Sequence, residues 1–134
     1  MSVFTVDMKN QPGELARVCE AMAGRGINLV LSATTRADGA TMVFIADDEA
    51  SAQTALEDAG IAYTIRPALT IRMENQPGTG AATFRRLADA GVNADVLLPV
   101  RVSDDLFLAV ICVDDQEKAR RALGARVVPY SPAL

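Results

Sequence analysis

The 134-residue sequence contains no histidine. Histidine is the usual general base near neutral pH and the commonest metal ligand, so its absence disfavours many hydrolytic and metal-dependent activities. The sequence also lacks a Gly-rich phosphate loop, a cluster of metal-ligand residues and a histidine-supported nucleophile. We therefore predict no catalytic residues, no metal site and no cofactor, and we expect the protein not to be an enzyme.

Cysteines and aromatic residues are also scarce. Cys19 and Cys112 lie within apolar patterns rather than in a CxxC motif, so we interpret both as core residues. The chain has no tryptophan, two tyrosines and four phenylalanines, and its formal charge is −4 without a basic cluster. Such a sequence offers neither a stacking platform nor a positive surface to nucleic acid, which we exclude as a partner.

Long apolar runs are missing as well. None approaches the ~20 residues that span a bilayer, and the N-terminal "MSVFTVDMKN" lacks the charged start and apolar core of a signal peptide. We expect a cytoplasmic protein with no membrane partner. Half of the residues are apolar (50%), which is enough for one substantial domain or two small ones.

What the chain does contain is an internal repeat. The stretch "VDMKNQPGELARV" (residues 6–18) returns as "IRMENQPGTGAAT" (residues 71–83), at an offset of 65 positions. Further along, the offset becomes 67, where Asp47-Asp48 align with Asp114-Asp115. A tandem duplication explains these matches, and we place the two repeats at 1–66 and 67–134.

Each repeat has the pattern strand, helix, strand, strand, helix, strand. In the first, apolar residues alternate over 4–8, follow helical spacing from Leu15 to Met22, and flank a hairpin signal at Asp38-Gly39. A second helix over 48–59 and a last strand over 61–66 follow; the second repeat has its hairpin at Ser103-Asp104, its second helix over 115–123 and its last strand over 126–130. The predicted fold class is α+β: two ferredoxin-like βαββαβ repeats, each with an antiparallel four-stranded sheet and both helices on one face.

One strand is apolar on both faces. The run "LFLAVICV" (106–113) has no polar position, whereas a sheet with one solvated face alternates. We therefore expect the face away from the helices to be covered, and we predict a homodimer.

The link between the repeats is short. Only Pro67 and Ala68 separate the last strand of the first repeat from the first strand of the second, and they span ~10 Å at most. If the sheets joined through their second strands within one chain, the link would have to cross about five strands at ~4.8 Å each. Two solutions stay open: the repeats exchange their last strands, or the edges pair between separate chains.

The repeated Asn-Gln-Pro-Gly turn leads from a strand into a helix. Pro12 suits the first helical position, and Gly13 leaves the backbone uncovered. Exposed N–H groups of residues 13–15, at the positive end of the helix dipole, favour a carboxylate. Asn10 and Asn28 carry amides that donate and accept hydrogen bonds, which suits a zwitterion. The alternative is that Pro-Gly only caps a helix and the asparagines serve turns; the spacing of 18 between the asparagines of both copies favours a binding site.

The βαββαβ order, the two turns and the Gly-x-Asn before each second strand (Gly26-Ile27-Asn28 and Gly91-Val92-Asn93) resemble ACT domains, two of which would cover essentially the whole chain. The resemblance implies non-catalytic, allosteric modules that bind amino acids where two ACT units meet and report to an enzyme or regulator. The chain is similar to the serine-sensing ACT units of phosphoglycerate dehydrogenase. The resemblance implies that Asn10 faces Asn93 and that Asn75 faces Asn28.

The chain departs from those units in ways that make its two sites inequivalent. Met8 and Met73 stand where they have a histidine, which disfavours serine as the ligand. The second turn has Thr79-Gly80 where the first has Glu14-Leu15, exchanging an apolar wall for space. Asp95, two residues past Asn93, could pair with an ammonium group. We expect the first turn, with Asn93 and Asp95, to form the preferred site.

The predicted function is an amino-acid-binding regulatory protein, with a small amino acid bound between repeats and an amino-acid biosynthetic enzyme as a further candidate partner. The alternative is an interaction module, or a regulatory subunit that docks such an enzyme without binding a ligand itself. The predicted ligand-binding residues are Asn10, Gln11, Pro12, Gly13, Glu14, Leu15, Asn28, Leu29, Asn75, Gln76, Gly78, Thr79, Asn93, Ala94 and Asp95.

Overall fold

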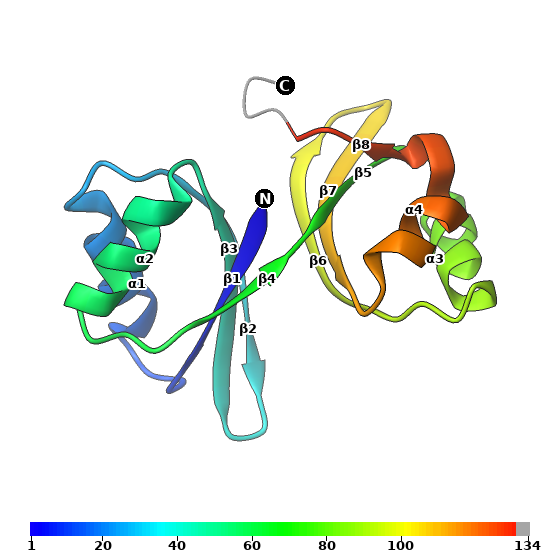
Figure 1. The fold of residues 1–134 in the computed structure, drawn as a ribbon. Helices are drawn as coiled ribbons and strands as arrows, with labels where there is room; N and C mark the ends of the chain where they lie inside the picture. The colour runs from blue at the N-terminus through cyan, green and yellow to red at the C-terminus, as the bar shows by residue number, and fades with distance from the viewer. Residues whose placement is uncertain (131–134) are drawn as a thin grey trace. The chain divides into compact units, whose positions relative to one another are not determined.

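The computed structural model of the protein describes residues 1–130. Within them the chain divides into two compact units: Ser2–Arg66, and the residues from Pro67 onward together with Met1. Figure 1 shows both units, coloured from blue at the N-terminus to red at the C-terminus. None of the helices in residues 1–130 is both long and apolar enough to cross a membrane.

The first unit is a four-stranded sheet with two helices on one face (Figure 1). Its elements are β1 (Ser2–Met8), α1 (Glu14–Ala23), β2 (Leu29–Arg36), β3 (Gly39–Ala46), α2 (Glu49–Asp58) and β4 (Thr64–Pro67). The strand order is β2-β3-β1-β4, and β3 runs antiparallel to both β1 and β2. The predicted hairpin between β2 and β3 is present, but its turn residues are Ala37 and Asp38, because Arg36 pairs with Gly39 across the turn and Gly39 already belongs to β3.

The second unit repeats this arrangement. Its elements are β5 (Leu69–Glu74), α3 (Thr79–Asp89), β6 (Ala94–Val102), β7 (Leu106–Val113), α4 (Gln116–Leu123), the 3₁₀ turn η1 (Gly124–Arg126) and β8 (Val127–Val128). The strand order is β6-β7-β5-β8. The predicted α+β class with two ferredoxin-like βαββαβ repeats is confirmed.

Each core lies between a sheet and its two helices. In the first unit the cross-strand partners Phe4 and Phe44 stack with ring centroids 5.0 Å apart, beneath Val18 and Met22 of α1. In the second unit the alternate β7 residues Ala109, Ile111 and Val113 pack with Leu87 of α3 and Leu123 of α4. The intervening residues of β7 point to the opposite face. The homodimer expected from that apolar face remains a prediction.

The predicted exchange of last strands is wrong. β4 lies beside β1 in the first sheet, and β8 lies beside β5 in the second, where Thr70 pairs with Val128. The conflict that motivated the exchange assumed one continuous sheet joined through the second strands of a single chain. Among residues 1–130 the strands form two separate sheets instead, so Ala68 only has to connect the end of β4 at Pro67 to the start of β5.

Two element boundaries also differ from those predicted. Pro12 is not the first helical residue: α1 begins at Glu14, after Gly13 with φ +91° as its N-cap. A left-handed residue cannot belong to the helix, so the proline lies in the turn before it. The last strands are shorter than the predicted 61–66 and 126–130: β4 covers Thr64–Pro67 and β8 covers Val127–Val128, with Arg126 in the 3₁₀ turn η1.

Candidate functional site

The two Asn-Gln-Pro-Gly turns share one backbone geometry. Gly13 has φ +91° and Gly78 has φ +90°, and neither α1 nor α3 receives a side-chain cap. A positive φ of this size is costly for residues with a Cβ, which explains why glycine occupies both positions. Each turn therefore delivers the chain into a helix whose first N–H groups are not covered by a side chain.

The start of α3 offers free hydrogen-bond donors. The first helical hydrogen bond runs from the Ala82 N–H to the Gly78 carbonyl (3.0 Å), and the Thr79 N–H donates to Gln76 (3.2 Å). The N–H groups of Gly80 and Ala81 have no partner among residues 1–130. With the positive end of the helix dipole behind them, they form a place for an anionic oxygen.

Asn75 ties the second turn to the β6–β7 hairpin. Its backbone N–H donates to the Asp105 carbonyl (3.2 Å), and its side-chain Nδ2 donates to the Ser103 carbonyl (2.6 Å). A carbonyl oxygen can only accept, so the amide must present its nitrogen there. The Oδ1 atom of Asn75 is thereby left as an acceptor.

A pocket of about 230 Å³ lies beside this turn. Its lining residues are Met73, Glu74, Asn75, Gln76, Gly80, Phe84, Leu97 and Phe107. The polar members come from the end of β5 and the turn, whereas Phe84, Leu97 and Phe107 supply an apolar wall. Leu97 is 40% exposed, which is unusual for a large apolar side chain on a strand and marks the open side of the wall. A Cβ added at Gly80 would meet no heavy atom within 4 Å, so the missing side chain leaves free space.

The first turn is occupied differently. The Glu14 carboxylate accepts a hydrogen bond from Gln11 Nε2 (2.9 Å) and lies 3.8 Å from the Arg17 guanidinium. This negative charge at the start of α1 disfavours a second anion there. Leu15, at the position that corresponds to Gly80, is 45% exposed. The first turn thus has both a charge and a side chain where the second has space.

The asparagines before the second strands are held by their backbones. The Asn28 N–H donates to Asp47 Oδ1 (3.1 Å), and the Asp47 N–H donates to the Asn28 carbonyl (3.2 Å). Asn93 and Asp114 repeat this exchange at 3.0 and 3.1 Å. The carboxylates of Asp47 and Asp114 therefore fix the start of β2 and of β6, a role that the sequence analysis did not assign.

Within one unit the two predicted asparagines lie at opposite ends of the sheet. Met8, just before the first turn, pairs with Ala40, whereas Leu29, just after Asn28, pairs with Ala46. These partners are six positions apart along β3, a distance of ~20 Å at the rise of a strand. The second unit shows the same separation, with Glu74 opposite Leu106 and Ala94 opposite Val113. The two asparagines of one unit therefore cannot both contact the same small ligand.

The structure divides the predicted residues of the second repeat among three places. Asn75 and Gln76 line the 230 Å³ pocket, and Gly78 and Thr79 line a larger cleft on another face of α3. Asn93, Ala94 and Asp95 lie at the far end of the sheet and line neither. The apolar wall was missed, although Gly80 had been recognised as a source of space. Within residues 1–130 no three His, Cys, Asp or Glu residues are grouped so as to hold a metal ion.

Comparisons with known proteins agree with this fold. Residues 2–59 match the ACT domain family model, whereas no curated protein matches the sequence. The crystal structure of protein BT0572 from Bacteroides thetaiotaomicron is 25% identical, with a TM-score of 0.84, over 98% of this chain and 92% of that chain.

Two further structures share the fold at lower identity. The ligand-free regulatory subunit of aspartate kinase from Thermus thermophilus is 23% identical over 93% of this chain and 90% of its own, with a TM-score of 0.68. The corresponding subunit from Thermus flavus is 22% identical over 91% and 88%, with a TM-score of 0.65. Residues 2–59 therefore match the ACT domain family, and the second repeat has the same fold.

Proposed function

We propose that this protein is a non-catalytic sensor that binds a small amino acid and regulates a separate biosynthetic enzyme in the cytoplasm. The observation that carries the proposal is the 230 Å³ pocket beside the second turn, whose lining combines Asn75, Gly80 at the start of α3 and an apolar wall. The fold that the chain shares with two regulatory subunits of aspartate kinase supports a regulatory role.

The pocket matches the three parts of an amino acid. The ligand's carboxylate accepts hydrogen bonds from the N–H groups of Gly80 and Ala81 at the start of α3. Its ammonium group donates to Oδ1 of Asn75, the atom left free by the bond to Ser103. The ligand's side chain contacts the apolar wall. At about 230 Å³ the pocket is smaller than the ~300–1,000 Å³ typical of drug-sized ligands, which suits a small amino acid.

A second ACT unit completes the site in this proposal. Asn75 and Asn93 lie at opposite ends of one sheet, so the strand-two asparagine that reaches the ligand belongs to another unit. In the homodimer that the apolar strand predicts, another copy of the chain supplies Asn28 to the site at Asn75. The same scheme gives Asn10 a partner in Asn93 and Asp95.

The second turn is the better site of the two. At the first turn, which the sequence analysis favoured, the Glu14 carboxylate repels the ligand's carboxylate and Leu15 takes up space that Gly80 leaves open. We therefore propose that the first turn serves structure and that the second binds the amino acid.

A thermal-shift panel of the twenty amino acids tests the proposal on the whole chain. A few well-placed polar contacts give an affinity in the micromolar to millimolar range, about −8 to −4 kcal/mol. A ligand at 100 times its dissociation constant adds ~2.7 kcal/mol to the free energy of unfolding, which is a clear shift. If no amino acid raises the melting temperature, the protein is an interaction module that docks its partner without a ligand.

A further inference from the structure

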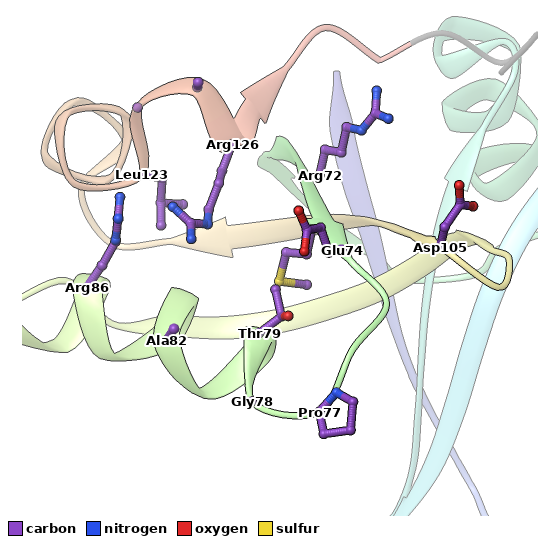
Figure 2. A pocket seen from close by; sticks show the side chains of 13 residues that line it. Arg72, Glu74, Pro77, Gly78, Thr79, Ala82, Arg86, Asp105, Leu123 and Arg126 are labelled. Carbon is purple, nitrogen blue, oxygen red and sulfur yellow. The ribbon is translucent and has the colours of Figure 1, made fainter.

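A second and larger cleft, of about 750 Å³, lies in the same repeat (Figure 2). It is lined by Arg72, Met73, Glu74, Pro77, Gly78, Thr79, Ala82, Arg86, Asp105, Leu123, Gly124, Ala125 and Arg126. Helical spacing places residues 79, 82 and 86 on one face of α3, about 150° around the axis from residues 80 and 84, which border the amino-acid pocket. The two cavities are thus different sites that share only Met73 and Glu74.

The cleft exists because β8 is short. β8 has two residues, which pair with Thr70 and Ile71 of β5, whereas the corresponding strand β4 of the first repeat has four. The residues before β8 form the 3₁₀ turn η1 instead of continuing the strand. The edge of β5 from Arg72 to Glu74 is therefore left without a β8 neighbour, and the space beside it is open.

Three arginines surround this space without a carboxylate partner. Figure 2 shows Arg126 directed from η1 toward α3 and Arg86 rising from α3, with Arg72 at the rim. None of the three forms an ion pair with any residue of 1–130. Other arginines do form ion pairs: Arg85 and Arg121 in the same repeat, and Arg17, Arg25 and Arg36 in the first.

The acidic residues of the cleft do not neutralise the arginines. Asp105 accepts a hydrogen bond from the Ser103 hydroxyl (3.2 Å), and the Glu74 carboxylate has no partner among residues 1–130. Three arginines against two acids give the lining a positive balance in a chain of net charge −4. Guanidinium groups that share a cleft repel one another, and a bound anion would relieve that repulsion through charge-assisted hydrogen bonds.

The arginines are also peculiar to the second repeat. At the offsets of 65 and 67 that align the repeats, Arg72 corresponds to Asp7, Arg86 to Ala21 and Arg126 to Ala59. The first repeat builds the same fold without any of the three charges. The arginines are therefore not needed to form the fold, and their convergence on one cleft requires another explanation.

We propose that this cleft binds a compact polyanion, a small molecule with two or more negatively charged phosphate or carboxylate groups. Arg86 and Arg126 hold its charged oxygens in bidentate contacts, and Arg72 adds a third positive charge at the rim. The start of α3, at Gly78 and Thr79, adds the positive end of a helix dipole. This site is independent of the amino-acid pocket.

Calorimetric titration of the whole chain with pyrophosphate and with citrate tests the site and separates the two anion classes. We expect at least one of these anions to bind, and Arg86→Gln or Arg126→Gln to weaken it about tenfold or more, since each removes a charge-assisted contact. Arg85→Gln is the matched control: it lies on the same helix, removes the same charge and lies outside the cleft, where it pairs with Asp89. The affinity of Arg85→Gln for the anion should stay within about twofold of that of the unmodified protein.

Glu74→Gln supplies a test that does not depend on weakened binding. Removing the Glu74 carboxylate, which has no partner among residues 1–130, should strengthen anion binding about threefold or more, and this variant provides the test if Arg126→Gln fails to fold. The proposal would be overturned if neither anion binds, or if Arg85→Gln and Arg86→Gln lower the affinity for the anion equally. Gly80→Leu, which fills only the other pocket, should leave anion binding intact, so that failure of one site is not mistaken for failure of the other.

Discussion

The side-chain nitrogen of Asn75 lies 2.6 Å from the carbonyl oxygen of Ser103. This contact, with the backbone bond from Asn75 to Asp105, fixes the second turn against the β6–β7 hairpin. The side chain of Asn10 in the first turn makes no hydrogen bond to any residue of 1–130. The second turn is thus held in one arrangement before any ligand arrives, which lowers the ordering cost of binding.

Asn75→Ala should weaken amino-acid binding and also destabilise the protein. The loss of a hydrogen bond to a charged ligand corresponds to about 1.5–3 kcal/mol, roughly a ten- to hundredfold weaker affinity. The loss of the bond to Ser103 lowers the free energy of unfolding by about 0.5–1.5 kcal/mol. Calorimetry with the best amino acid of the panel measures the first effect, and urea denaturation measures the second.

Asn10→Ala is the matched control for that variant. Because the Asn10 side chain has no partner among residues 1–130, its removal should change the free energy of unfolding by less than about 0.5 kcal/mol. An Asn75→Ala protein that is less stable yet binds the amino acid with unchanged affinity would reduce Asn75 to a structural residue.

Gly80 should separate the volume of the pocket from the stability of α3. Gly80→Leu places the side chain found at Leu15 into the pocket and should abolish amino-acid binding. Gly80→Ala adds a Cβ that meets nothing within 4 Å, and should raise the free energy of unfolding by up to about 1 kcal/mol because alanine favours a helix. Thermal denaturation with and without the amino acid measures both. Full binding by Gly80→Leu would show that the ligand lies elsewhere.

The helix cap at Asp48 should make stability depend on pH. Hydrogen bonds from the Ser51 N–H and then from its hydroxyl lower the pKa of the Asp48 carboxyl from its usual 3.8. A carboxyl whose pKa is lowered by folding stabilises the protein above the unfolded value and loses that effect as pH falls through the folded value. Asp48→Ala should therefore lower the melting temperature most at neutral pH, and the difference should shrink below pH 3.8.

Asp104→Ala offers a comparison for this cap. Asp104 is exposed in the β6–β7 hairpin and makes no hydrogen bond or ion pair with residues 1–130. Its removal should leave the melting temperature nearly unchanged at every pH. A difference between the original protein and Asp48→Ala that stays constant down to strongly acidic pH would contradict the assignment of the cap.

The stacked pair in the first core should carry a large share of the stability of its unit. Phe44 is fully buried and stacks on Phe4, so Phe44→Ala should lower the free energy of unfolding by about 3–5 kcal/mol. Leu31→Ala, on the neighbouring strand, removes a side chain that is 38% exposed and should cost far less. Urea denaturation of the two variants makes the comparison; equal losses would mean that the packing at Phe44 is not decisive.

Much of the fold was predictable because it depends on local signals. Alternating apolar residues marked β1 and β5, and the Asp-Gly pair marked the first hairpin. The second helices begin alike in both repeats, because a carboxylate caps each: Asp48 accepts from the Ser51 N–H and Asp115 from the Lys118 N–H, both at 3.0 Å. The strand exchange was wrong because it required knowledge of how whole sheets are joined, which no local pattern contains.

The site was less predictable, because its residues lie far apart in the sequence. Asn75 and Gly80 could be identified from the repeated turn, but the wall opposite them comes from Leu97 and Phe107, on strands that the turn's own sequence does not specify. The arginine cleft combines Arg86 with Arg126, which are 40 positions apart, and depends on how early β8 ends. Residues that are distant in the sequence line one cavity only because of the tertiary structure, which local sequence patterns do not specify.

The left-handed glycines at the two turns have a consequence for how the copies diverged. Gly13 and Gly78 give both turns the same left-handed backbone, so the residues that follow them can differ without changing its path. One duplicate acquired Glu14 and Leu15, while the other acquired Thr79 and Gly80. Loops of one shape thereby present a charged surface with a large side chain in one repeat and an open, uncharged surface in the other.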